Sequence, residues 1–426
     1  MTKMERRTFL KGVASVSAFT ILKPGTAFGT NANSGIRMGI IGCGGRGTGV
    51  ISSMLKNTNT AIIAMADLFD DKLQNAITGL NKVNAEKGVP EIQKNNMYKG
   101  SKAYLQLLNN KEVDAVLIST PAYAHPELLE AAVAAGKHAY CEKPVAIDVD
   151  GCKRVQKIAA GINGKLSAVF GFQIRYASPF IEMINRIQQG AIGDIVNVQL
   201  YYLSSGVGIG PINNMSFDEY RIRNHYHFHA ISGGTLLDQG IHILDVCNWV
   251  LQSHPIQAIG IGGSKAGAEF GDAWNNYQII YEYPNNISVS IHTTQVGPEF
   301  GDVCARFIGS KGIAEAHYSG GVFISGDNPW DSGVLRCGTS VPTEEQKKAG
   351  VFLSALQDAD ANKEIAFIKS IETGNYINHL QTGCESTLTA LLGREAAIRR
   401  ECISWDELVL SGERIDPNLD LSQFDK

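Results

Sequence analysis

Short apolar runs alternate with amphipathic segments along the first third of the chain. The predicted strands are Ile36–Ile41, Ala61–Ala66, Val113–Ser119 and His138–Cys141. The predicted helices, which show helical spacing of apolar residues, are Thr48–Lys56, Leu68–Val83 and His125–Ala135. Strands that alternate with helices indicate βαβ units and a parallel sheet. We therefore predict an α/β protein whose residues 35–150 form a Rossmann dinucleotide-binding domain.

The pattern changes after residue 144. The predicted elements that follow are helices at Asp148–Ala160 and Pro179–Gln189, and strands at Leu166–Phe172 and Ile195–Leu203. Further on, the turn sequences Pro284-Asn285-Asn286 and Ser310-Lys311-Gly312 each separate two apolar runs, which is typical of hairpins. Residues 151–426 are thus expected to form an α+β domain with a mainly antiparallel open sheet. Its helical C-terminal segment, Ile365–Arg400, is a candidate to pack back on the first domain.

The N-terminal segment has the pattern of an export signal. Arg6 and Arg7 precede an uncharged run, Gly12–Leu22, and small residues follow it. That run is shorter than the roughly 20 residues that a membrane-spanning helix needs. The arginine pair resembles the twin-arginine type. We predict that residues 1–34 are such a signal peptide and linker and that the protein is periplasmic or exported; a basic N-terminus without a targeting role is the alternative.

Composition narrows the classes of protein that remain. Hydrophobic residues make up 44% and charged residues 19%, as in ordinary globular proteins. The formal net charge of −4 gives no reason to expect nucleic-acid binding, and no later stretch predicts stable membrane insertion. None of the eight cysteines forms a C-x-x-C pair, so neither a zinc site nor a redox pair is indicated. Disulfides cannot be assigned from the sequence.

A glycine-rich loop follows the first predicted strand. Gly42–Gly47 reads GCGGRG, a helix follows it, and Asp67 ends the next strand about 20 residues later. In this pattern the glycines permit a tight turn and close approach of the backbone to a pyrophosphate. Asp67 would accept hydrogen bonds from the ribose hydroxyls, which favours NAD over NADP. The predicted cofactor-binding residues of this segment are Gly42, Gly44, Gly45, Arg46, Gly47 and Asp67.

A second motif, Cys141–Pro144, ends the fourth predicted strand. Ligands bind just outside the carboxyl ends of strands in doubly wound sheets, so Glu142 and Lys143 join the predicted cofactor site. Lys143 could polarise or deprotonate a substrate hydroxyl beside the nicotinamide. A surface lysine in a loop is the alternative on this motif alone.

A third motif lies in the second domain. Asp238 and His242 are four residues apart and would share one face of a helix. A carboxylate next to an imidazole raises its pKa and fixes its orientation, so this pair could act as a base for a sugar hydroxyl. An ordinary helix with a core histidine is the alternative.

Three alternating histidines precede that motif, in His225–His229 (HYHFH). Zinc takes three or four such ligands, but no cysteine or carboxylate cluster completes a site, so we assign no metal. We expect instead that Tyr226, His227 and His229 contact a sugar, because rings stack on sugar faces and polar tips bind hydroxyls.

The three motifs, in this order and spacing, resemble the Gfo/Idh/MocA oxidoreductase family along essentially the whole mature chain. The resemblance implies that Lys143 and His242 are the catalytic pair, with Asp238 orienting His242. It also implies further site residues: Ser119, Pro121 and His125 at the nicotinamide, and Arg175 and Tyr176 at the substrate. Members act mostly on sugars, cyclitols and glycosides, and often form homo-oligomers; a dimer or tetramer is therefore expected.

Three functions remain open. The first is an NAD-dependent oxidoreductase that oxidises a secondary hydroxyl, such as the C3 hydroxyl of a sugar. The second is an NAD-dependent glycosidase or lyase that uses transient oxidation and elimination without net redox change. The third is a non-catalytic sugar-binding protein. Because twin-arginine export carries folded proteins, we also hypothesise that NAD is bound before export, held tightly and recycled in place.

Overall fold

A parallel sheet organises the N-terminal half of the chain. The computed structural model describes residues 35–265, 271–296, 302–334 and 354–425. The strands of this sheet are β1 (Ile36–Ile41), β2 (Thr60–Asp67), β3 (Met97–Lys99), β4 (Ala115–Ile118), β5 (His138–Cys141) and β6 (Ala168–Phe170). Their order is β3-β2-β1-β4-β5-β6 and every pairing is parallel. This is the order of a Rossmann fold, so the predicted fold class is confirmed.

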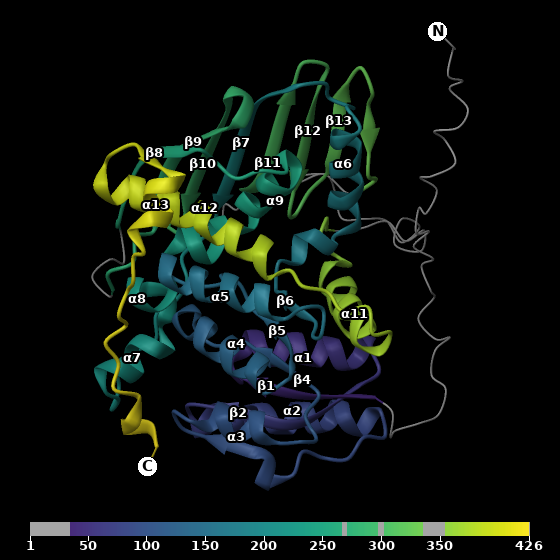
Figure 1. The fold of residues 1–426 in the computed structure, drawn as a ribbon, viewed down its shortest axis with the longest axis vertical. Helices are drawn as coiled ribbons and strands as arrows, with labels where there is room; N and C mark the ends of the chain where they lie inside the picture. Colours follow the sequence, from purple (N-terminus) through teal and green to yellow (C-terminus); the bar gives the residue numbers. More distant parts are fainter. Residues whose placement is uncertain (1–34, 266–270, 297–301, 335–353, 426) are drawn as a thin grey trace. The chain divides into compact units, whose positions relative to one another are not determined.

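Helices cover both faces of the parallel sheet (Figure 1). They are α1 (Gly45–Asn57), α2 (Asp70–Glu86), α3 (Ala103–Asn109), α4 (His125–Ala134) and α5 (Val149–Gly161). Along β1, Met38 and Ile40 belong to one apolar core and Ile41 to another. A strand that is apolar on both faces is what a sheet buried between two helical layers requires.

The second sheet has nine strands, in the order β14-β13-β12-β11-β7-β10-β9-β8-β15. They are β7 (Ile195–Leu203), β8 (Gln257–Gly263), β9 (Asn276–Tyr283), β10 (Ile287–Thr294), β11 (Asp302–Gly309), β12 (Gly312–His317), β13 (Val322–Gly326), β14 (Trp330–Asp331) and β15 (Ile403–Ser404). Only the β7–β10 pairing is parallel among the pairings of these strands. Both predicted hairpin turns are present, between β9 and β10 and between β11 and β12.

Helices pack on one face of this sheet (Figure 1). They include α6 (Ser178–Gln188), α9 (Ile241–Leu251) and α12 (Leu380–Arg399). The sequence of α6 shows why: Phe180, Met183, Ile184 and Ile187 repeat at helical spacing and are all buried. Each such burial contributes about 1.5–3 kcal/mol. The remaining described helices are α7 (Phe217–Arg223), α8 (His229–Ser232), α11 (Ala359–Glu372) and α13 (Trp405–Ser411).

The C-terminal helices also contact the parallel-sheet half. Helix α11 packs on α1, where Ser53 Oγ donates to Glu364 Oε2 at 2.6 Å, and α12 packs on α5. The predicted single helical segment is in fact two helices, because α11 ends at Thr373 and Gly374, whose φ is +71°. Glycine adopts this left-handed conformation without the steric penalty of a Cβ atom.

Three further elements differ from expectation. The sequence pattern did not predict β3 and α3, which are too short to show a clear period. Strand β6 extends the parallel sheet beyond residue 150 by pairing with β5.

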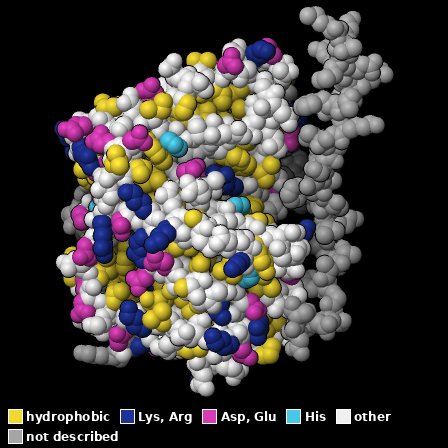
Figure 2. All heavy atoms as spheres, viewed as in Figure 1, with side chains coloured by type: hydrophobic (Ala, Val, Ile, Leu, Met, Phe, Trp, Pro, Cys, Tyr) yellow, Lys and Arg dark blue, Asp and Glu magenta, His cyan; other side chains and the backbone are white. Residues whose placement is uncertain are grey.

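The described residues contain no helix long and apolar enough to cross a membrane. On the face that Figure 2 shows, acidic and basic side chains are interspersed rather than separated by sign. The predicted signal segment, including Arg6 and Arg7, lies outside the described residues.

Candidate active site

The glycine loop lies between β1 and α1 and is open to a ligand. Gly42 has a φ of +94°, and a Cβ atom there would collide with the Ser119 carbonyl. At Gly47 a Cβ would collide with the Gly42 carbonyl. A Cβ atom added at Gly44 or Gly45, by contrast, would meet no other atom within 4 Å. Helix α1 begins there without a side-chain cap, so its first N–H groups can bind a pyrophosphate.

Asp67 ends β2 beside this loop. Its carboxylate accepts hydrogen bonds from the main-chain N–H groups of Cys43, at 2.6 Å, and Phe69, at 2.9 Å. Burial raises the pKa of Asp67, and these two hydrogen bonds oppose that rise. The carboxylate is therefore fixed at the position where a Rossmann domain binds the adenosine ribose. The loop and Asp67 together fit NAD.

Arg46 projects from the glycine loop toward the second motif. Its guanidinium donates to Glu142 Oε1 at 3.1 Å and lies 3.6 Å from Asp360 Oδ1 of α11. Glu142 is 5% exposed and packs against Gly171. Glu142 thus holds Arg46 at the edge of the cofactor cleft.

Ser119, Pro121 and His125 lie in the segment that follows β4. Ser119 N donates to the carbonyl of Ile41, and Pro121 begins a short 3₁₀ turn. His125 is 1% exposed, with Nδ1 2.7 Å from Pro144 O and Nε2 2.8 Å from Thr120 O. His125 therefore ties this segment to the Lys143–Pro144 loop, whose peptide bond is cis.

Lys143 contacts Asp238. Its Nζ donates to the main-chain carbonyl of Asp238 and lies 3.4 Å from Oδ1 of the same residue. Both side chains are mostly buried, with 17% and 12% of their surface exposed. The structure thus joins the second motif to the third, although Lys143 and Asp238 are 95 residues apart in sequence.

His242 is the second residue of α9 and is buried, at 8% exposure. Its ring stacks on Tyr202, with centroids 6.3 Å apart, and meets Tyr318 edge-on at 6.2 Å. Among the described residues no hydrogen-bond partner is found for its Nδ1. Burial, and then the positive charge of Lys143, lower the pKa of His242 well below its usual value. The imidazole is therefore neutral at pH 7 and able to accept a proton.

The expectation that Asp238 raises the pKa of His242 is wrong. Asp238 lies in the π-helical turn η6 (Leu236–Gly240), whose longer repeat breaks the α-helical spacing assumed from the sequence. Its carboxylate contacts Lys143, and the pKa of His242 is lowered.

The histidine-rich segment is partly buried. The rings of His225 and Tyr226 lie 4.1 Å apart, centroid to centroid, and burial raises the pKa of Tyr226 to about 12. The main-chain N–H of His229 donates to Asp272 Oδ1 at 2.7 Å, and burial, then Arg394, lower the pKa of its imidazole to about 4. For His227, Nε2 is buried without a partner among the described residues. The assignment of Tyr226, His227 and His229 as substrate contacts stays a prediction.

No metal group forms from these histidines within the described residues. The group with ligand atoms close enough for a metal is Asp302, Cys304 and His317, on β11 and β12. The two ring nitrogens of His317 already lie 2.7 Å from Glu315 and 3.4 Å from Asp302. The hydrogen bond with Glu315 raises the pKa of His317, which favours the imidazolium over a metal ligand.

Arg175 and Tyr176 lie behind the site. Arg175 forms a two-pronged ion pair with Asp245 at 2.8 and 2.9 Å, and Asp245 is one turn after His242 on α9. Ser386 Oγ adds a 2.6 Å hydrogen bond to the same carboxylate. Tyr176 OH lies 3.3 Å from His379 Nδ1. In this structure Arg175 holds the helix that carries His242.

Several residues near the site were missed by sequence reasoning. They are Tyr202, His225, Gln173, Tyr318, Asp360 and Lys363. Lys363 is fully buried and donates to Asp360 at 2.6 Å, and its charge also lowers the pKa of His242. Of these residues, only His225 could have been found from the sequence, because it belongs to the HYHFH motif. The others come from elements that are distant in sequence and that the fold brings together.

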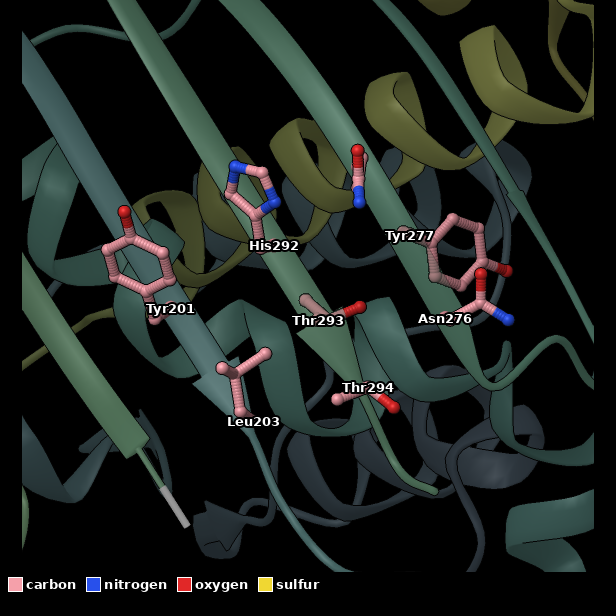
Figure 3. Close-up of a pocket in the computed structure, with 8 residues that line it drawn as sticks. Tyr201, Leu203, Asn276, Tyr277, His292, Thr293 and Thr294 are labelled. Carbon is pink, nitrogen blue, oxygen red and sulfur yellow. The ribbon is translucent and has the colours of Figure 1, made fainter. Parts of the chain in front are cut away.

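A surface pocket of about 250 Å³ lies on the sheet formed by β7, β10 and β9 (Figure 3). Its lining residues include Tyr201, His292 and Asn276. The rings of Tyr201 and His292 stack at 5.5 Å. None of the predicted catalytic residues lines this pocket.

The fold and the glycine loop define an NAD-binding oxidoreductase. Residues 36–170 match the model of the oxidoreductase family with an NAD-binding Rossmann fold, and residues 180–315 match the GFO/IDH/MocA C-terminal domain. The chain belongs to the Gfo/Idh/MocA oxidoreductase family.

Named relatives share the architecture at low identity. Inositol 2-dehydrogenase of Rhizobium meliloti is 24% identical over 369 residues, covering 85% of this chain and 96% of that protein. The structure of scyllo-inositol dehydrogenase from Lactobacillus casei, with bound NAD(H) and scyllo-inositol, has a TM-score of 0.64 and 21% identity, covering 87% of this chain and 99% of that one. The structure of an aldose-aldose oxidoreductase from Caulobacter crescentus has a TM-score of 0.65 and 18% identity. The match covers 87% of this chain and 99% of that one.

Proposed function

We propose that this protein oxidises a secondary hydroxyl of a cyclitol or sugar, with His242 as the base and Lys143 as the cation beside the reacting oxygen. The observation that carries the proposal is His242 itself: a buried imidazole kept neutral by burial and by Lys143, whose Nδ1 has no partner among the described residues. A neutral imidazole with such a nitrogen is suited to accept a proton from a ligand.

In this proposal, residues of the chain itself accept the hydroxyl proton and stabilise the negative charge that forms on the substrate oxygen. The Gly42–Gly47 loop and Asp67 would hold NAD, which would supply the hydride acceptor for oxidation at the carbinol carbon. His242 takes the hydroxyl proton, and the ammonium of Lys143 stabilises the negative charge that develops on oxygen. Asp238 holds Lys143 in place through its carbonyl and carboxylate. Tyr202 and Tyr318 pack on His242 and exclude water from it.

The substrate class follows from the site and from the relatives. Tyr226 supplies a ring and a hydroxyl of the kind that binds a polyol, and the negative charge of Asp238 contributes to its raised pKa. The named relatives are inositol dehydrogenases and an aldose oxidoreductase. The glycosidase and non-catalytic alternatives have no comparable support in these proteins, so we favour a cyclitol or a sugar.

A substrate panel tests the proposal. Purified protein with NAD would be offered myo-inositol, scyllo-inositol, glucose and a methyl glycoside, with formation of reduced nicotinamide and of ketone product both measured. We expect matching amounts of both with at least one compound. Glycoside cleavage without a ketone product would instead indicate the redox-neutral alternative.

We further propose that the chain is exported with NAD already bound and recycles it in place. The support is the Arg6-Arg7 segment, together with the lack of a nucleotide supply expected outside the cytoplasm. Cell fractionation combined with mass spectrometry of nucleotide released from the mature protein tests this. Mature protein that is located outside the cytoplasm and exchanges NAD freely would contradict it.

We also propose a homo-oligomer formed through the strand face opposite the helices. Along β9 the buried Tyr277, Ile279 and Tyr281 alternate with Ile280, which is 57% exposed. Ile259 of β8 pairs with Ile280 and is 49% exposed. Ile280→Glu should lower the particle mass measured by light scattering, whereas a monomeric parent protein would contradict the proposal.

A further inference from the structure

The C-terminal strap, defined as residues 412–425, returns from the second sheet to the Rossmann half. In Figure 1 it is the yellow segment that runs from α13 past α7 to the C-terminus. Ile415 N donates to Asp148 Oδ2 at 2.7 Å, and the Glu413 carbonyl accepts from Asp150 N at 2.9 Å. The strap is therefore attached at its start to α5.

Helix α7 fixes the middle of the strap. Arg221 donates to the carbonyls of Pro417, at 2.9 Å, and Asn418, at 2.6 Å. Asp218 accepts from the main-chain N–H of Asp420 at 3.0 Å. Two charged side chains of one short helix thus bind three main-chain groups of the strap.

The end of the strap lies on the carboxyl ends of β2 and β3. Phe424 meets Phe69 edge-to-face, with ring centroids 5.1 Å apart. The Asp425 carboxylate accepts from Ser101 N at 2.6 Å and from Ser101 Oγ at 2.9 Å. These strand ends form the edge of the sheet where a Rossmann fold receives the adenosine of its cofactor.

Phe69 is enclosed from two sides. It is two residues beyond Asp67, and its N–H donates to that carboxylate. The guanidinium of Arg223, on α7, lies 4.0 Å from the centroid of the Phe69 ring and also pairs with Asp71 at 2.7 Å. Phe69 therefore contacts both Arg223 and Phe424 and is bonded through its N–H to the Asp67 carboxylate.

We propose that the strap and α7 form a clamp on the adenosine end of the NAD site, with Phe69, Arg223 and Phe424 as positioning residues that slow release of the cofactor. The inference rests on the NAD-binding function and extends it. Because α7 and the strap join the second half of the chain to the end of β2, opening this end for NAD to leave requires separating Phe424 from Phe69. None of the three residues contacts Lys143 or His242 in the described structure, so the clamp acts on retention of NAD rather than on proton transfer.

The test measures the dissociation rate of bound NADH, followed by its fluorescence after a chase with excess NAD. Phe424→Ala should raise this rate several-fold, on the order of 3–10-fold, and Phe424→Leu, which keeps apolar packing, should raise it less. Leu410→Ala, at an 82% exposed position just before the strap, is the matched control and should leave the rate unchanged.

The outcomes separate the clamp from a merely structural role. An unchanged rate in Phe424→Ala, with a lowered melting temperature of the nucleotide-free protein, would overturn the clamp and leave NAD binding intact. Parent protein that binds no NADH would overturn NAD binding and the clamp together. Because Phe424 is only partly buried, the alanine variant is expected to fold.

Discussion

Lys143 and Asp238 are held together by two contacts, from the lysine ammonium to the main-chain carbonyl and to the carboxylate of Asp238. This relationship makes Asp238 the partner of Lys143 rather than of His242. It positions a cation from the Rossmann half against the turn that precedes His242. In the proposed mechanism this charge would stabilise the developing alkoxide, and it adds to burial in lowering the pKa of His242.

Replacing Lys143 tests that dual role. Lys143→Met should lower kcat by about 10²–10⁴-fold, because the developing charge loses its cation. The pKa of His242 should rise, since Lys143 now lowers it. Activity needs the neutral imidazole, so the acid limb of the kcat/KM profile should move to higher pH. A profile that keeps its position would show that Lys143 does not act on His242.

Replacing His242 tests the assignment of the base. His242→Asn should reduce kcat by about 10²–10⁴-fold while NAD binding is retained, because the residue acts on the proton and not on the nucleotide. His292→Asn, on the opposite face of the second sheet, is the control and should keep its turnover. Calorimetric titration with NAD would check that both variants still bind cofactor. Full activity of His242→Asn would remove the proposed base.

Cofactor choice depends on Asp67. Asp67→Ser removes the carboxylate that we expect to repel a 2′-phosphate and to accept hydrogen bonds from the ribose. We expect weaker NAD binding and a smaller preference for NAD over NADP, measured as the ratio of kcat/KM for the two cofactors. An unchanged ratio would show that Asp67 does not face the ribose.

The support behind His242 should matter for stability. Arg175→Met leaves Asp245 buried without its partner, which typically costs about 3–5 kcal/mol of unfolding free energy. Arg186 pairs with Glu182 on the surface of α6, with side chains 41% and 48% exposed. Arg186→Met should therefore cost less than about 1 kcal/mol. Chemical denaturation of both variants measures the difference; equal costs would contradict the supporting role of Arg175.

We predict that Glu364, at the contact between α1 and α11, makes the stability of the protein depend on pH. Burial raises the pKa of Glu364 from 4.5 to about 7, so the folded state holds its proton more tightly than the unfolded state does. As pH rises from about 4.5 through 7, this group progressively destabilises the folded protein. Glu364→Gln should remove that part of the dependence, and its stability relative to the parent protein should increase with pH. A pH-independent difference between the two would contradict the raised pKa.

The sequence predicted the parts of the site that depend on local pattern. Gly42–Gly47 and Asp67 could be located because a strand, a turn and a helix with fixed spacing define them, and strand β1 was predicted at its observed bounds. Asp238 and His242 were placed in one regular helix, and the π-helical turn η6 altered their relation. Such a turn is a rare insertion into helical structure, which a periodic pattern does not reveal.

Other parts come from long-range contacts. Asp360 and Lys363 reach the cleft only because α11 packs on α1, which lies far earlier in the chain, as the Ser53–Glu364 hydrogen bond shows. Phe424 meets Phe69 for the same kind of reason. No local spacing signals these neighbours, so sequence reasoning could not have named them.

The most direct test of the central claim is a turnover measurement with inositols. We would incubate the purified protein with NAD and a substrate deuterated at every carbon, either myo-inositol or scyllo-inositol. The reduced nicotinamide would then be isolated for mass spectrometry. The account predicts one deuterium in each reduced nicotinamide, an equal amount of inosose, and loss of both in His242→Asn. Binding of NAD without transfer of deuterium from either inositol, or from the sugars of the panel, would contradict a secondary-alcohol dehydrogenase.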